Sequence, residues 1–135
     1  MEELLFPGFT LQQVNAVSNL GLAHIGDGVY ELLCRTYLCV GGNKTVRTLH
    51  RDTVQLVNAP TQAALAQKIL PALTEEENDF FRRGKNAHTH AAPKAASRRE
   101  YATATGLETL FGALYLLGRK DRLQELFLMM MNEEA

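Results

Sequence analysis

Two stretches of sequence decide how this chain is expected to fold: LAHIGDGVYE at Leu22–Glu31 and TGLETLFGA at Thr105–Ala113. Both are apolar with helical spacing, and each carries one acid, Asp27 in the first stretch and Glu108 in the second. A carboxylate buried in an apolar setting needs a partner, a proton or a cation. We therefore expect two helices that meet around this pair of carboxylates.

Four glycines interrupt the same two stretches: Gly26, Gly28, Gly106 and Gly112. A glycine inside a helix costs about 1 kcal/mol relative to alanine, so four of them need a physical reason. Close approach of the two helix backbones is the plain explanation, and room for a bulky ligand is the other.

The rest of the chain predicts an all-α fold, because no segment shows the sustained alternation of a strand. Helical spacing and capping signals predict seven helices, at about 10–20, 21–40, 44–57, 60–70, 74–84, 98–117 and 120–132. Thr10 and Thr74 are the expected N-caps of the first and fifth helices, and Gly84 is the expected end of the fifth. Apolar spacing places Leu32 on the inner stripe of the second helix, and Val46 and Val54 on that of the third.

Length and composition indicate one domain spanning residues 1–135, with 46% apolar and 21% charged residues. No apolar run approaches the roughly 20 residues of a membrane span. The N-terminal residues lack a signal-peptide pattern. Cys34 and Cys39 lie five residues apart on one predicted helix and point in different directions, so no internal disulfide is expected. Together these features predict a cytoplasmic protein.

Charge is unevenly distributed, although the net charge of −1 argues against a generally basic nucleic-acid binder. Residues 82–99 contain no acid and six basic residues, namely Arg82, Arg83, Lys85, Lys94, Arg98 and Arg99. A local patch of this kind is sufficient to bind phosphate groups.

Residue types alone leave the role of Asp27 and Glu108 open, because they equally fit solvated side chains or ordinary ion pairs. Magnesium suits such a pair, since it takes oxygen ligands, keeps several waters and often uses one or two carboxylates. Zinc fits less well, because no His/Cys set has ligand spacing. His88 and His90 lie in a basic loop without a nearby acid, which makes them poor candidates for metal ligands.

An ordered set of motifs then resembles Mini-ribonuclease III, the short bacterial branch of the ribonuclease III family that lacks the double-stranded-RNA-binding domain. The motifs are GDGVYE at 26–31, NA at 58–59, RRGKNA at 82–87, PK at 93–94 and TGLETLFGALYL at 105–116. The resemblance implies an all-α homodimer that cuts double-stranded RNA with Mg²⁺, in maturation of the large-subunit (23S) ribosomal RNA. It implies that Asp27 and Glu108 are the catalytic, metal-binding residues. A ribosomal protein or the pre-ribosome is a candidate partner.

The chain departs from the larger family members, which place further acids around the metal. Ala23 and Thr105 occupy two of those positions, and the third falls near Ala59 or Pro60. Water, with scissile phosphate oxygens, would then complete the coordination shell. Two other classes stay open: a non-catalytic RNA-binding or assembly module of the same fold, and a helical domain whose basic loop binds an acidic protein.

Overall fold

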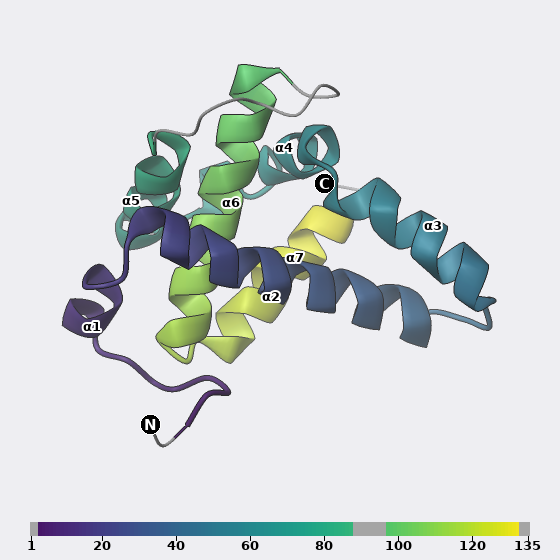
Figure 1. Ribbon diagram of the computed structural model, residues 1–135, viewed down its shortest axis with the longest axis horizontal. Helices are drawn as coiled ribbons and strands as arrows, with labels where there is room; N and C mark the ends of the chain where they lie inside the picture. Colours follow the sequence, from purple (N-terminus) through teal and green to yellow (C-terminus); the bar gives the residue numbers. More distant parts are fainter. Residues whose placement is uncertain (1–2, 88–96, 133–135) are drawn as a thin grey trace.

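The computed structural model describes residues 3–87 and 97–132, and this part of the chain folds into seven α-helices (Figure 1). The helices are α1 (Leu11–Asn15), α2 (Asn19–Val40), α3 (Val46–Val57), α4 (Ala59–Ala66), α5 (Glu75–Lys85), α6 (Arg98–Leu116) and α7 (Lys120–Met131), with a short 3₁₀ turn, η1 (Leu70–Ala72), before α5. No strand occurs among the described residues, so the predicted all-α class is confirmed.

Helix α6 is the centre of the molecule. It packs against α2, α4, α5 and α7, and Figure 1 shows α2 crossing it with α4 and α5 on either side. Apolar side chains from these helices form one connected core, whose largest fully buried members include Tyr30, Phe80, Phe111, Leu22 and Leu110. A helix covered on so many sides holds mainly apolar or small residues there, and Glu108 is the one charged residue in 103–114.

The predicted N-caps are confirmed. The Thr10 hydroxyl accepts a hydrogen bond from the Gln13 amide, and Thr74 and Glu77 form a complete capping box. The predicted first helix over 10–20 is wrong, because α1 ends at Asn15 and a second cap follows. Ser18 accepts a hydrogen bond from the Gly21 amide at 2.9 Å, which starts α2 at Asn19.

Gly84 does not end the fifth helix. It lies buried inside α5, where a Cβ atom would come within 2.1 Å of the Thr109 hydroxyl oxygen on α6. The helix continues to Lys85, and Asn86 is its C-cap. Gly84 therefore serves the contact between α5 and α6, a tertiary requirement that local sequence does not reveal.

The inner faces of two helices also differ from the prediction. Val46 is 82% exposed and Val54 is 50% exposed, while Thr53 is buried between them, with its hydroxyl donating to the Leu49 carbonyl at 2.8 Å. On α2 the predicted inner residue Leu32 is 66% exposed. Among the described residues the main neighbours of α3 are α2 and α4, so a narrow strip of α3 is covered.

Both cysteines are free thiols, as expected, with Cys34 buried and Cys39 exposed. Within the described residues, none of the helices has the length and apolar character needed to cross a membrane.

Candidate active site

The crossing of α2 over α6 is made possible by glycines. A Cβ atom on Gly26 would lie 1.6 Å from the main-chain oxygen of Glu108, and one on Gly112 would lie 2.0 Å from that of Leu22. The two backbones are therefore in direct contact, which confirms the close-approach explanation for these glycines. Gly106 serves the same purpose toward α5. Gly28 does not, because nothing lies within 4 Å of the position that its Cβ would take.

This crossing brings Asp27 and Glu108 together, as the sequence predicted. Burial raises the pKa of Glu108 to about 8, with further upward contributions from the charge of Asp27 and from a hydrogen bond between the two carboxyl groups. The two side chains differ in setting, since Glu108 is partly buried and Asp27 is exposed. The expectation of a carboxylate held away from water thus applies to Glu108 and is wrong for Asp27.

A third polar group, which sequence reasoning missed, reaches the same place from α4. The Gln62 amide nitrogen donates to the Val57 carbonyl at 2.7 Å and lies 3.5 Å from Oε2 of Glu108. Gln62 is buried, and its interaction with Glu108 lowers the pKa of that carboxyl, against the larger upward effects. An uncharged residue near the start of a short helix offers no sequence signal for such a role.

Two of the six basic residues proposed for RNA contact are engaged in ion pairs or hydrogen bonds within the protein. Arg82 forms an exposed ion pair with Asp79 at 3.0 Å. Arg83 donates to the side-chain oxygens of Asn15 and Asn19, at 2.8 and 3.1 Å, and so joins α5 to α1 and α2.

Three of the other four basic residues lie at the ends of α5 and α6. Lys85, Arg98 and Arg99 are exposed, and Arg99 lines a shallow hollow together with residues of α4, including Pro60 and Ala63. Lys94 lies outside the described residues, as do His88 and His90. The structure thus places Arg99 beside the helix that carries Gln62.

Residues 20–119 match the family model of the ribonuclease III domain. The chain belongs to the ribonuclease III family. The Mini-ribonuclease 3 of Symbiobacterium thermophilum is 48% identical over 106 residues, which cover 78% of this chain and 82% of that protein. The Mini-ribonuclease 3 of Clostridium tetani is 41% identical over 125 residues, covering 92% and 83%. These matches confirm the resemblance drawn from the sequence.

A solved structure agrees with this assignment. The crystal structure of a protein from Fusobacterium nucleatum superimposes with a TM-score of 0.77 at 32% identity, covering 87% of this chain and 94% of that one. Membership of the ribonuclease III family identifies the chain as an endoribonuclease.

Within the ribonuclease III fold, the described residues of this chain bring no further acid to the pair. No group of three or more His, Cys, Asp or Glu side chains that could hold a metal ion occurs in the described ranges. Glu31 forms an ion pair with Arg35 at 2.9 Å, and Ala23 is buried. The Thr105 hydroxyl donates to a main-chain carbonyl one turn earlier. His24 is exposed, so it is not a core histidine.

The residues present nevertheless suit a hard divalent cation. Two carboxyl groups converge, and the charge of one disfavours ionisation of the other, so a cation between them would relieve the repulsion. The Gln62 carbonyl oxygen is buried and finds no hydrogen-bond donor among the described residues. An oxygen-only donor set with few carboxylates is the kind that Mg²⁺ uses together with water.

Proposed function

We propose that this ribonuclease III family member is a magnesium-dependent endoribonuclease that cuts double-stranded RNA. One observation carries the proposal: the glycine-mediated crossing of α2 and α6 brings Asp27 and Glu108 into direct interaction. The precursor of the large-subunit (23S) ribosomal RNA is the proposed substrate. Its support is the similarity to proteins named Mini-ribonuclease 3 over most of the chain.

In this proposal Asp27 and Glu108 hold the cation and thereby place it. When bound, magnesium would lower the pKa of a water molecule. It would also offset the negative charge of the phosphate. The exposure of Asp27 keeps the site open to water and to the RNA backbone, whereas burial of Glu108 fixes one side of it. No side-chain nucleophile is needed, because water attacks the phosphodiester.

The RNA is proposed to lie along the basic ends of α5 and α6. A-form RNA is recognised chiefly through its shape, its 2′-hydroxyls and its phosphates, so exposed cations suffice. Arg99 precedes Glu108 by nine residues, which corresponds to about 14 Å along α6 at 1.5 Å per residue. This distance is within the length of one RNA duplex, but at 3.6 residues per turn the two side chains project from opposite sides of α6. Lys85 and Lys94 remain the proposed phosphate ligands of the preceding segment.

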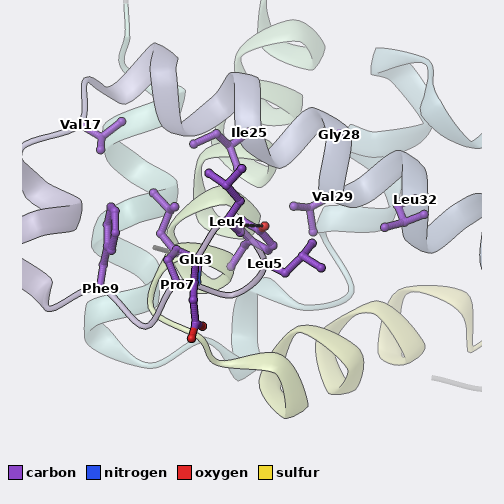
Figure 2. A pocket seen from close by; sticks show the side chains of 12 residues that line it. Glu3, Leu4, Leu5, Pro7, Phe9, Val17, Ile25, Gly28, Val29 and Leu32 are labelled. Carbon is purple, nitrogen blue, oxygen red and sulfur yellow. Dashed lines mark hydrogen bonds between the residues drawn. The ribbon is translucent and has the colours of Figure 1, made fainter. Parts of the chain in front are cut away.

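We propose that two copies of the chain act together, as the family resemblance implies. An apolar hollow of about 570 Å³ opens beside α2, and Gly28, Val29 and Leu32 line it (Figure 2). Figure 2 shows Leu4 and Leu5 of the N-terminal segment across from these residues, and both leucines are largely exposed. A second copy would cover this apolar surface, and each copy would cut one strand.

Cleavage of a long RNA duplex tests the enzyme proposal. Wild type and Asp27→Asn are incubated with the duplex, with and without Mg²⁺. Asp121→Asn on α7 is the control, because it makes the same chemical change outside residues 20–119, which match the ribonuclease III domain. We expect magnesium-dependent cutting that Asp27→Asn loses and Asp121→Asn keeps. Binding without cutting by the wild type would instead identify an RNA-binding or assembly module, and no binding a protein-interaction domain.

The salt dependence of duplex binding tests the RNA path. Lys85→Ala and Arg99→Ala are each compared with Lys120→Ala, which removes an exposed charge beyond the other end of α6. A variant that can no longer reach one phosphate should show a slope of log affinity against log salt that is smaller by about one. Equal slopes for all three variants and the wild type would place the RNA elsewhere on the protein.

Sedimentation at micromolar concentration tests the dimer. We expect a dimeric wild type and a monomeric Leu32→Glu variant with weakened cleavage, whereas Val46→Glu, a charge introduced at an exposed site on α3, should leave the dimer intact. A monomeric wild type with full activity would contradict the proposal.

A further inference from the structure

Gln62 reaches the acidic pair although it is not an acid and was not expected at the site. It lies on α4 and is 2% exposed. The orientation of its amide follows from its first partner: the Val57 carbonyl can only accept a hydrogen bond, so the amide nitrogen must face it at 2.7 Å. The carbonyl oxygen of Gln62 is thereby excluded from that contact.

The second hydrogen of the same amide nitrogen is directed to the active site. Oε2 of Glu108 lies 3.5 Å from Nε2, which is at the long limit of a hydrogen bond. A single nitrogen thus links the end of α3 to the carboxyl group on α6, and the bond from Gln62 to Glu108 spans 46 residues of sequence. Such a link restricts the rotation of Glu108 about its side-chain bonds.

The carbonyl oxygen of Gln62 has no partner among the described residues, although it is fully shielded from solvent. Buried polar atoms without partners are rare in native proteins, and a bound water or ion is a common explanation. A water molecule held at the two carboxyl groups would supply the missing donor, since this oxygen belongs to the amide whose nitrogen reaches Glu108.

We propose that Gln62 is a positioning residue of the metal site, whose amide nitrogen orients Glu108 and whose carbonyl oxygen anchors a water held at the two carboxyl groups. This inference rests on the proposed magnesium-dependent activity. It also accounts for a departure from the larger family members, because the acid expected near Ala59 or Pro60 is absent and Gln62 follows on the same helix.

A purely structural alternative is that Gln62 only satisfies the Val57 carbonyl. Asn58 has that kind of role, since its side chain caps α4 and donates to the Val54 and Gln55 carbonyls. Loss of such a bond changes folding stability and leaves metal affinity alone. The two roles are therefore separable by experiment.

The test compares the wild type with Gln62→Met, which keeps the shape of the side chain without its polar atoms. Gln124→Met, at an exposed position on α7, is the matched control. Three properties are measured: thermal unfolding, manganese binding by electron paramagnetic resonance, and the separate kcat and KM for duplex RNA. We expect Gln62→Met to bind manganese about tenfold more weakly and to lower kcat about tenfold, with an unchanged KM. Gln124→Met should match the wild type in all three.

The inference is overturned if Gln62→Met folds and keeps manganese affinity and kcat within about twofold of the wild type, because outer-shell losses typically exceed that range. If Gln62→Met does not fold, the wild type itself supplies the test by nuclear magnetic resonance with ¹⁵N-labelled glutamine. Addition of Mg²⁺ should shift the Gln62 side-chain amide signals, and this shift should be absent in Asp27→Asn. If the signals do not respond at magnesium concentrations that support cleavage, Gln62 is not a positioning residue of the metal site. A wild type that neither cuts RNA nor binds manganese would refute the proposed function itself.

Discussion

Replacing Gly26 with alanine is expected to force α2 and α6 apart. The new Cβ atom would lie 1.6 Å from the Glu108 main-chain oxygen and 2.8 Å from the Gly112 nitrogen, whereas ordinary contacts begin at 3.4 Å. The difference of 3.4 − 1.6 Å means that about 1.8 Å must be opened between the backbones. Both obstructing atoms are main chain, so no side-chain rotation can relieve the clash.

The size of the effect follows from two opposing contributions. Overpacking a close-packed core costs about 1–3 kcal/mol and occasionally more, and a backbone clash belongs at the upper end. Alanine returns about 1 kcal/mol of helix propensity relative to glycine. We expect a net loss of about 2 kcal/mol in the free energy of unfolding. Because the same movement separates Asp27 from Glu108, cleavage should fall by about 100-fold, as a misplacement near 1 Å can cause.

Gly28→Ala is the matched control, since it makes the same change two residues later on the same helix, where the Cβ atom meets open space. It should raise the free energy of unfolding by up to about 1 kcal/mol. Urea denaturation followed by circular dichroism measures both variants. A Gly26→Ala protein as stable as the wild type, or equal losses in the two variants, would refute the close-contact reasoning.

Two further predictions concern ionisable groups. In metal-free buffer, ionisation of Glu108 opposes folding: below pH 4.5 the carboxyl is protonated in both states, and from there to pH 8 only the unfolded chain has lost the proton. The raised pKa corresponds to at most about 5 kcal/mol at 1.36 kcal/mol per tenfold change in proton affinity, and partial exposure reduces this to about 2–3 kcal/mol. Urea titrations should therefore show Glu108→Gln gaining on the wild type as pH rises from 4.5 to 8, and a gap independent of pH would contradict the assignment. Glu77 is different, because burial alone would raise its pKa but hydrogen bonds from Arg122 and Thr74 outweigh it and hold the pKa below its ordinary value. Glu77→Gln should cost about 3 kcal/mol at neutral pH, and this difference should vanish as pH falls below 4.5 through the lowered pKa. Glu125→Gln, which removes the exposed partner of Arg122, should cost less than about 1 kcal/mol in the same unfolding assay; comparable losses in the two variants would show that burial of Glu77 is not decisive.

Local signals in the sequence were sufficient for the helical class and for most helix ends. Caps such as Thr10 and Thr74 act on residues three positions away, so the pattern that forms them is contained in a few adjacent residues. The pair of acids in glycine-containing apolar segments was also visible in the sequence, and it pointed to Asp27 and Glu108. Their interaction in space confirms that they meet, while their catalytic role stays a proposal.

Contacts between distant segments lay beyond the sequence, because they depend on which helix covers which face. Gly26 and Gly28 read alike, yet only Gly26 touches the neighbouring backbone. Gly84 resembled a helix end and proved to be a contact between α5 and α6. Arg83 counted as a free cation until the structure placed its guanidinium against Asn15 and Asn19.

The sequence by itself determined the helices, the two acids and, through ordered motifs, the ribonuclease III family. The tertiary structure alone decided how those acids are held. It left Asp27 exposed to solvent and Glu108 partly buried. It also brought Gln62, from a third helix, to the carboxyl group of Glu108. The physical reason is that a hydrogen bond across 46 residues depends on helix packing, which no local pattern encodes.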